Sequence, residues 1–531
     1  MTSQSPATNP AAGSAKSMDA IMALCKRRGF VYQASEIYGG INGFWDYGPL
    51  GSQLKKNLRD AWWQDMVLRP CWGKTGPGGR EVRCVPVETC IIQHPKVWAA
   101  SGHVGGFNDP MMDCKESKRR YRADHLRYVK TTDPSEGRMF AFVEGDADTF
   151  EEALKRLGKY VKRTLGEGDL EIITDAKPDG QFLARVVGPH AKEAGTLTEP
   201  RAFNLMFKTY VGATATDDDV AYLRPETAQG VFVQFKNVVD TTRVKVPFGI
   251  GNVGKSFRNE VTPRNFTFRS REFEQMELEF FCHPDESMEW FTFWREFRMA
   301  WWESLGLAGE NLRLYDTPKK DLAHYSQAGS DVEYRFPFTY PGFGELEGVA
   351  HRGNFDLTQH QQHSGAKMEY NDTERGELLP NGQRRGERYL PHCIEPAAGL
   401  DRGVLAVLCE AYTKDESRPS PEFMKIHPRL APIKAAVFPL VAKDGMPEIA
   451  HKLHDELLRR FWREGLVESD DKQTIGKRYA RMDEAGCPYC FTIDSDTLKD
   501  QTVTVRDRDT GGQQRIAISH AAAFLSDKLG L

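Results

Sequence analysis

Residues 255–282, KSFRNEVTPRNFTFRSREFEQMELEFFC, decide the fold of this chain. In the second half, every second residue is apolar, which is the period of a strand with one buried face: Met276, Leu278 and Phe280. The opposite face carries Arg269, Arg271, Phe273, Gln275, Glu277 and Glu279. The first half, 255–262, also favours a strand and places Arg258 and Glu260 on one face. The two strands either line a charged cleft or form a solvated sheet face with weak salt bridges.

Just upstream, residues 249–256 read GIGNVGKS and satisfy two phosphate-binding patterns, GxxxxGK[ST] and GxGxxG. Both patterns need a helix that starts at the last glycine, because its free N–H groups and its dipole hold the phosphate. Here FRNEVTP follows, which favours a strand and ends in a proline. We therefore interpret the segment as part of a strand rather than as a nucleotide-binding loop.

The composition predicts a soluble chain with several domains. At 531 residues it is long enough for roughly three or four domains of typical size. No apolar run approaches the ~18 residues of a membrane-spanning helix, so we expect no membrane contact. Lys and Arg number 71 against 75 Asp and Glu, a net charge of −4. A nucleic acid would therefore have to bind a local basic patch.

Ten cysteines are scattered too irregularly for a disulfide framework, which favours a reducing, cytoplasmic location. The CPYC segment at 487–490 has redox or half-zinc spacing, but no second Cys or His pair follows it. His360 and His363 have HxxH spacing without the glutamate of HExxH, so we expect a structural or substrate-loop role. Residues 1–17 lack the apolar segment of a signal peptide and predict a disordered tail.

Beyond this tail the pattern divides the chain into two units. Residues 18–430 form the first, which an α+β segment interrupts at about 113–200. We expect a strand over 81–92 in this unit and another over 181–187 in the inserted segment. Prolines at 419–432 mark a linker, and 431–531 alternate strands and helices like a compact α/β domain. In the first unit a helix at 284–305 repeats large aromatic residues at helical spacing, which we interpret as core packing: Trp290, Trp294, Phe297 and Trp301.

Several segments resemble the class II aminoacyl-tRNA synthetases. FRNE (257–260) with RSREF (269–273) resembles motif 2, EPAAGLDRGVLAVL (395–408) resembles motif 3, and GFWDYGPLGSQLKKNLRDAWW (43–63) resembles the dimer-forming motif 1. Four further segments resemble one family of this class in particular, the homodimeric glycyl-tRNA synthetases. They are WAASGHVGGFNDP (98–110), YLRPETAQGVF (222–232), GELEGVAHRGNFDL (344–357) and GKRYARMDEAGCPYCFTID (476–494). The resemblance implies an α+β fold: an antiparallel sheet flanked by helices, an inserted α+β domain and a C-terminal α/β anticodon-binding domain.

The resemblance also implies the residues that bind ATP and catalyse the reaction. Arg258 would contact the α-phosphate and Glu260 the adenine amino group, while Phe273 would stack on the adenine. Arg269 and Arg402 would contact the γ-phosphate from two sides. Glu345 would bind Mg²⁺ through its carboxylate, because Mg²⁺ prefers oxygen ligands.

By the same resemblance, the amino-acid pocket is acidic. Three carboxylates would hold the ammonium group of glycine, namely Glu226, Glu277 and Glu395, and Arg352 would bind its carboxylate. Since glycine has no side chain, alanine must be rejected by a steric clash. Ala397 stands where the family often has serine, so one hydroxyl contact near the glycine is absent.

A second departure from the family concerns zinc. Related bacterial chains often carry CKxCK, whereas this chain reads CKES at 114–117. The spacing of the metal ligands is broken, so we expect no zinc there.

Two basic segments are candidates for contact with tRNA(Gly). The insertion holds seven cations between 115 and 130, and the candidates are Lys118, Arg119, Arg120 and Arg122. From charge alone this run is equally compatible with a solvated helix face. In the C-terminal unit the candidates are Lys477, Arg478, Arg481, Arg506 and Arg508.

The function implied by the resemblance is ligation of glycine to tRNA through a glycyl-adenylate, by a homodimer that uses ATP and Mg²⁺. Two alternatives remain at this point. One is a class II synthetase for another amino acid, against which the acidic pocket argues. The other is a non-catalytic relative that keeps the fold as a nucleic-acid-binding module, against which the intact ATP residues argue.

Overall fold

The structure is a computed structural model and describes residues 16–144, 146–174, 176–213, 215–216, 219–323, 325–339, 342–380, 382 and 384–530. Most of the expected tail, 1–17, lies outside these residues. Lys16 does not belong to a disordered tail, because its Nζ donates to the carbonyl oxygens of Cys409 (2.9 Å) and Glu410 (2.7 Å) at the end of helix α10 (Leu400–Ala411). Among the described residues, no helix is long and apolar enough to cross a membrane.

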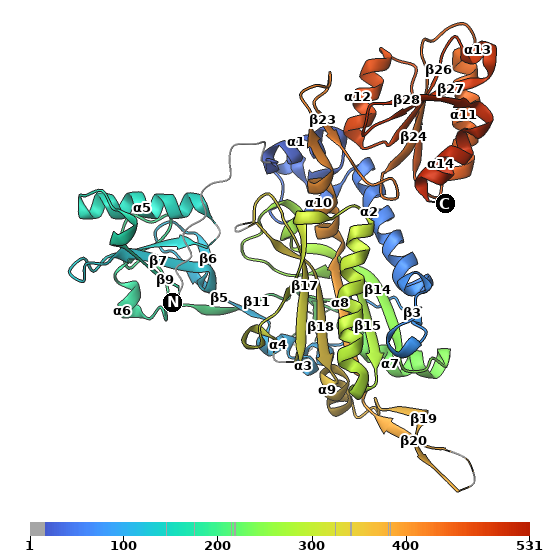
Figure 1. Cartoon of the computed structure of the whole chain (residues 1–531). Helices are drawn as coiled ribbons and strands as arrows, with labels where there is room; N and C mark the ends of the chain where they lie inside the picture. The colour runs from blue at the N-terminus through green and yellow to red at the C-terminus, as the bar shows by residue number, and fades with distance from the viewer. Residues whose placement is uncertain are drawn as a thin grey trace.

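A seven-stranded sheet forms the centre of the molecule (Figure 1). In spatial order its strands are β16 (Leu312–Asp316), β17 (Ala328–Tyr334), β18 (Gly344–Gly353), β21 (His392–Gly399), β15 (Glu272–Cys282), β14 (Phe248–Phe257) and β3 (Cys84–Pro86). All neighbours are antiparallel except β14 and β3. This confirms the expected α+β fold with an antiparallel sheet.

The GIGNVGKS segment lies within β14, as interpreted from the sequence. The strand begins at Phe248, earlier than the expected residue 255. Its glycines allow close approach of neighbouring side chains. A Cβ atom on Gly254 would lie 2.2 Å from Nη2 of Arg224, and one on Gly251 would lie 2.6 Å from Cγ2 of Val67. The glycines are therefore explained by packing and not by a bound phosphate.

One face of the sheet is apolar and packs against helices α2 (Pro49–Trp63), α8 (Ser287–Ser304) and α10. Met276, Leu278 and Phe280 are fully buried there. The Phe280 ring lies 4.5 Å from that of Trp290 and 5.2 Å from that of Trp294. The aromatic repeat of α8 is therefore core packing, as the sequence predicted. The other face of the sheet carries the polar residues of β15.

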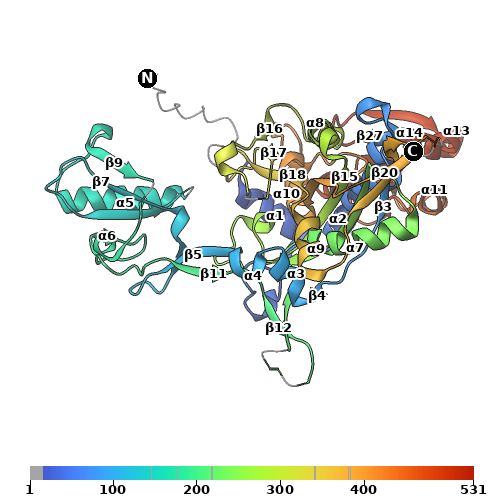
Figure 2. The same ribbon diagram turned by 90° about the horizontal axis from the view of Figure 1, so that it is seen from below.

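The insertion projects away from the central sheet on a long strand pair (Figures 1 and 2). β5 (Asn108–Asp113) pairs with β11 (Arg201–Asn204) and β6 (Arg120–Arg122). Beyond them a second sheet contains β10 (Val186–Val187), β8 (Met139–Val143), β7 (Leu126–Thr131) and β9 (Leu170–Ile173), packed against α5 (Ala147–Val161). The basic run lies on β6, β7 and their connections, and not on a helix. Residues 181–187, expected as a strand, begin with helix α6 (Gly180–Leu183).

The C-terminal unit contains a five-stranded sheet that is partly parallel and partly antiparallel. Its strands are β25 (Leu466–Ser469), β24 (Ile433–Pro439), β26 (Tyr489–Ile493), β27 (Thr502–Asp507) and β28 (Gln513–Ala517). Helices α11 (Met446–Phe461) and α14 (Ala521–Leu529) share one core with this sheet, and α12 (Ile475–Ala485) contributes to a second. Asn57 of α2 donates to the carbonyls of Leu430 (3.1 Å) and Ala431 (3.0 Å), which fixes the preceding linker to the first unit.

The remaining elements surround these sheets. They are α1 (Met18–Arg28), β1 (Val31–Gln33), β2 (Trp45–Tyr47), β4 (Ile92–Gln93), α3 (Pro95–Ala100), α4 (His103–Gly106), β12 (Lys208–Tyr210), β13 (Val220–Leu223), α7 (Ala228–Thr242), α9 (Phe355–Ser364), β19 (Tyr370–Leu378), β20 (Arg384–Tyr389), β22 (Tyr412–Lys414), β23 (Glu422–Met424) and α13 (Thr497–Asp500). The strand expected over 81–92 is reduced to β3 and the start of β4.

Candidate active site

A cavity of about 460 Å³ opens on the polar face of the central sheet. It gathers residues from the end of β14, from β15, β18 and β21, and from the start of α10. Its lining includes every residue that the sequence predicted for ATP, glycine and metal binding: Glu226, Arg258, Glu260, Arg269, Phe273, Glu277, Glu345, Arg352, Glu395, Ala397 and Arg402. The lining runs from Phe107 to Arg402, so segments far apart in sequence are brought into one site.

Arg258 and Arg402 of the cavity are each held by a backbone carbonyl, and Arg402 also pairs with the Glu345 carboxylate at 3.3 Å. Nε of Arg258 donates to the Pro225 carbonyl (3.0 Å), and its guanidinium carbon lies 5.3 Å from the centre of the Phe273 ring. Nη1 of Arg402 donates to the Glu345 carbonyl (2.9 Å). Among the described residues, the buried Nη1 of Arg269 and Oε2 of Glu260 have no hydrogen-bond partner. Because a buried unpaired polar atom is costly, these atoms indicate a place for a polar ligand.

The other end of the cavity is acidic. Glu277 is 2% exposed and accepts hydrogen bonds from Nε2 of Gln275 (3.1 Å) and from the Thr227 hydroxyl. Burial, with the nearby negative charge of Glu226, raises the pKa of Glu277. Burial also raises the pKa of Glu395, although Arg352 opposes this shift. A cation placed between these carboxylates would stabilise their charged forms.

Glu226 behaves differently from the other two carboxylates. Burial alone would raise its pKa, but the charges and hydrogen bonding of His103, together with Arg352, hold the pKa of Glu226 well below its usual range. Nε2 of His103 lies 3.4 Å from Oε2 of Glu226, and its Nδ1 is 2.8 Å from the Ser101 hydroxyl. Of these three carboxylates, Glu226 is therefore the one that stays ionised over the widest pH range.

Arg352 lies in the cavity wall but is already bound to two acids. It donates to both oxygens of Asp356 (2.8 and 2.9 Å) and to Oε2 of Glu395 (2.6 Å). A guanidinium has five N–H donors, so contact with a substrate carboxylate would have to use the donors that remain. The centre of the Tyr325 ring also lies 4.3 Å from the guanidinium carbon of Arg352.

Sequence reasoning did not single out two residues at or beside the cavity for this site. Asp331 of β17 does not line the cavity but is opposite Gly348 of β18, which does, and burial, together with the charges of Glu345 and Glu333, raises the pKa of Asp331 to about 7. Arg122, predicted as a tRNA contact, instead lines the cavity and lies 3.0 Å from Asp109. Neither position could be found from local patterns, since both depend on contacts between separate strands.

Asp401, beside Arg402, ties the cavity to helix α2. Its carboxylate accepts hydrogen bonds from the Tyr47 hydroxyl (2.7 Å), from Nζ of Lys55 (2.8 Å) and from the Glu274 backbone N–H (2.6 Å). Burial, together with Asp401, raises the pKa of Tyr47. The start of α10, which carries Arg402, is thus fixed to β15 and to the helix that resembles motif 1.

The other basic candidates of the insertion are far more accessible. Lys118 and Arg119 are exposed, and within the described part of the chain no carboxylate lies within ion-pair distance of either. Arg120 is exposed but pairs with Asp113 (2.7 Å). Of the four candidates in this run, Lys118 and Arg119 are therefore the ones that remain available to a phosphate backbone.

Most of the C-terminal candidates are corrected by the structure. Arg478 is 2% exposed and donates to the carbonyls of Pro439 (2.7 Å), Asp470 (2.8 Å) and Leu440 (3.1 Å). Arg508 is equally buried and binds the Gly486 and Ile426 carbonyls. Arg506 forms a two-pronged pair with Asp483, and Arg481 pairs with Asp470. Only Lys477, of these five, is exposed without such a partner among the described residues.

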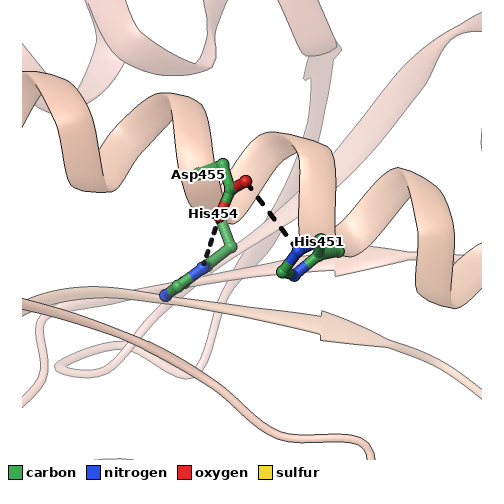
Figure 3. A group of neighbouring side chains, drawn as sticks. All are labelled: His451, His454 and Asp455. Carbon is green, nitrogen blue, oxygen red and sulfur yellow. Dashed lines mark ion pairs between the residues drawn. The ribbon is translucent and has the colours of Figure 1, made fainter.

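Within the described residues, one group of three metal-type side chains comes together, on α11 (Figure 3). Nε2 of His451 is 3.8 Å and Nδ1 of His454 is 3.6 Å from the Asp455 carboxylate. Asp455 also faces Arg459 at 3.8 Å, which competes with a cation for the same oxygens.

The CPYC thiols are both buried, and hydrogen bonding to Cys487, together with burial, raises the pKa of Cys490, which disfavours thiolate chemistry.

Two family descriptions match the chain. "tRNA synthetase class II core domain (G, H, P, S and T)" matches residues 209–474, and "Anticodon binding domain" matches residues 434–528. These matches cover the central sheet with its cavity and the C-terminal sheet.

Curated relatives match over nearly the full length. A glycine–tRNA ligase of Rhodopirellula baltica is 49% identical over 96% of this chain and 99% of its own length. The glycine–tRNA ligases of Caldanaerobacter subterraneus and Geobacillus kaustophilus are 45% and 44% identical, over 96% and 97% of this chain and 98% and 99% of their own lengths. With the fold and the cavity described above, these likenesses show that the chain belongs to the glycine–tRNA ligase family of class II aminoacyl-tRNA synthetases.

Proposed function

We propose that this enzyme joins glycine to tRNA(Gly) in two steps within the described cavity. The glycine carboxylate attacks the α-phosphorus of ATP, which forms glycyl-adenylate and releases pyrophosphate. The terminal ribose hydroxyl of the tRNA then attacks the glycyl carbonyl and displaces AMP. The observation that carries this proposal is that one cavity is lined both by Arg258, Arg269 and Arg402 and by Glu226, Glu277 and Glu395. No side-chain nucleophile is required, so catalysis depends on positioning and charge neutralisation.

At the phosphate end, we assign Arg258 to the α-phosphate and Arg269 and Arg402 to the γ-phosphate. The unpaired Nη1 of Arg269 supports this assignment, since a phosphate oxygen would satisfy it. Phe273 offers a ring face to the adenine, and the unpaired Oε2 of Glu260 accepts a hydrogen bond from the adenine amino group. These side chains neutralise and orient the phosphates while pyrophosphate leaves.

At the acidic end, Glu226, Glu277 and Glu395 receive the glycine ammonium. Ala397 lies opposite both Glu277 and Gly348 in the sheet register, so the floor of this pocket is made of small residues of β18 and β21. Arg352 uses its remaining donors to approach the glycine carboxylate. Alanine and larger amino acids are excluded because their side chains would clash with the wall.

Carboxylates of two neighbouring strands at the edge of the cavity suit Mg²⁺. Glu345, Glu333 and Asp331 lie on β18 and β17, and the raised pKa of Asp331, about 7, reflects burial and the negative charges of Glu345 and Glu333, which Arg402 opposes. Oxygen ligands of this kind suit Mg²⁺, which when bound neutralises phosphate charge. We assign Glu345 and Asp331 as the residues that would hold it. The sequence motif at 114–117 carries no expected zinc ligand set.

The remaining assignments concern partners and organisation. We propose a cytoplasmic homodimer with α2 at its interface, a catalytic unit over 18–430 with an insertion at about 113–200, and an anticodon-binding unit over 431–531. The ten free cysteines favour the reducing compartment. Lys118 and Arg119 of the insertion and Lys477 of α12 are the exposed cations that would contact tRNA.

The test is amino-acid-dependent exchange of pyrophosphate into ATP by the purified protein without tRNA. We expect exchange with glycine and none with alanine, serine, threonine or proline. Exchange with one of the other amino acids would keep the adenylate chemistry but refute the pocket assignment. No exchange with any amino acid would refute the catalytic assignment of the cavity.

A further inference from the structure

A buried hydrogen-bond network lies behind the acidic end of the cavity. Gln229 of α7 is 0% exposed, and its Nε2 donates to Oε1 of Glu226 (3.0 Å) and to Oδ1 of Asp356 (2.9 Å). Its Oε1 lies 2.9 Å from Nε2 of His360 on α9. His360 is 6% exposed and does not line the cavity. One amide thus connects a carboxylate just before α7 with a carboxylate and an imidazole of α9.

The chemistry of the three partners fixes the orientation of the amide. An ionised carboxylate only accepts hydrogen bonds, so the NH₂ group of Gln229 must face Glu226 and Asp356. Its oxygen then faces His360, whose Nε2 must carry a hydrogen. Burial, with the charge of His363, lowers the pKa of His360 and favours the neutral ring. Since Nε2 keeps its hydrogen in the neutral and the protonated ring alike, the pair with Gln229 persists in both forms.

The same network continues to the second acid of the pocket. Asp356 accepts from Gln229 and also binds Arg352 through both oxygens. Arg352 in turn donates to Glu395 (2.6 Å). The orientation of Glu226 and that of Glu395 are therefore linked through one amide, one aspartate and one guanidinium, none of which is exposed.

We propose that Gln229 and His360 are positioning residues for the glycine ammonium, an inference that rests on the proposed function. Glu226 has one neighbour on each oxygen, Gln229 on Oε1 and His103 on Oε2. Loss of the Gln229 contact leaves the carboxylate free to rotate toward His103. Glycine offers no side chain for further contacts, so its capture depends on the direction of these few hydrogen bonds. His360 fixes the amide so that both of its N–H groups face the acids.

The test compares KM for glycine with KM for ATP in pyrophosphate exchange. Gln229→Leu removes both donors and His360→Leu releases the amide, so we expect each to raise KM for glycine about tenfold or more and to leave KM for ATP within about twofold. His360→Gln keeps an N–H near the position of Nε2, and we expect a KM for glycine between those of the wild type and His360→Leu. His363→Leu, one turn further along α9 and exposed, is the matched control and should match the wild type.

Melting temperatures of all variants are measured beside the kinetics. If the leucine variants do not fold, the order of KM values among the wild type, His360→Gln and His363→Leu decides the question. The inference is wrong if the wild type uses glycine and His360→Gln or Gln229→Leu leaves its KM unchanged. A parallel rise of KM for ATP would assign a general structural role and also overturn it. Failure of the wild type to use glycine would refute the proposed function instead.

Discussion

The catalytic cavity and the C-terminal unit both carry arginines that the sequence marked as functional, but these arginines have different partners. In the cavity, Arg269 keeps a buried donor unpaired, and Arg258 is held by one carbonyl and by aromatic rings. In the C-terminal unit, Arg478 and Arg508 donate to backbone carbonyls inside the protein; Nε of Arg478 also lacks a partner among the described residues, but the side chain is 2% exposed. A buried cation held by internal carbonyls stabilises the fold, whereas one that lines a cavity with a free donor, as Arg269 does, is available to a ligand. Charge in the sequence does not distinguish these cases.

The largest effect should come from the cavity. Arg258→Ala removes a guanidinium that we assign to the α-phosphate, where charge develops in the transition state. We expect glycine-dependent pyrophosphate exchange to fall about 100- to 1,000-fold, as when one such donor is removed from other enzymes. The melting temperature should change little, because the side chain makes one hydrogen bond to the protein. Pyrophosphate exchange at near wild-type rates would refute the assignment of Arg258 to the α-phosphate.

In the C-terminal unit the same kind of substitution should affect stability instead. Arg478→Met leaves three carbonyl oxygens without their donor, so we expect the unfolding free energy of this unit to fall by about 2–4 kcal/mol. Exchange without tRNA should persist at temperatures where the variant is folded. The control is the exposed neighbour, Lys477→Met, which should change stability by no more than about 0.5 kcal/mol. Equal stability of both variants, measured by urea unfolding, would contradict the burial of Arg478.

The carboxylates of the cavity can be tested through pH. In the folded protein the pKa of Asp331 is about 7, above its ordinary value, so its contribution to stability is largest at low pH and is lost as pH rises through 7. Asp331→Asn should therefore gain stability over the wild type between about pH 4 and 7, by a few kcal/mol at most because the group is partly solvated. Added Mg²⁺ should stabilise the wild type at pH 8 and not the variant. Thermal unfolding without ATP measures both effects, and equal stabilisation of the two proteins would refute this metal assignment.

The insertion provides a comparison between free and paired cations on one surface. We expect Lys118→Ala with Arg119→Ala to raise KM for tRNA about three- to tenfold and to weaken the dependence of that KM on salt. Arg120→Ala, whose guanidinium is paired with Asp113, should have a smaller effect. Pyrophosphate exchange without tRNA should be unchanged in the double variant and in Arg120→Ala. A larger effect of Arg120→Ala would show that pairing in the free protein does not predict contact with RNA.

The smallest expected effect concerns Ala397. A serine there restores the hydroxyl that the family often has, beside Glu277 in the sheet register. One additional hydrogen bond contributes roughly 0.5–1.5 kcal/mol, so KM for glycine should fall roughly two- to tenfold. A higher KM would mean that the pocket has no room for the hydroxyl.

Local patterns predicted much of this molecule. The alternation in β15 and the aromatic repeat in α8 each specify which face is buried, because burial follows the period of the element. The resemblance of FRNE, RSREF and EPAAGLDR to family motifs placed Arg258, Arg269 and Arg402, and all three line one cavity. Patterns could not show how Arg478 and Arg122 are paired, because their partners lie on other segments: the Pro439 carbonyl of β24 for Arg478 of α12, and Asp109 of β5 for Arg122 of β6. They also failed at residues 181–187, where a strand was expected and helix α6 begins.

The sequence by itself determined the family, the antiparallel sheet and the identity of the charged side chains that line the cavity, since these depend on residue type and short-range spacing. Only the tertiary structure decided which charges are free. Arg352, His360 and Gln229 acquire their roles from neighbours on other segments, as do the buried arginines of the C-terminal unit. The physical reason is that the free energy of a charge depends on burial and on the partners within a few ångströms, and folding assembles those partners from distant parts of the chain.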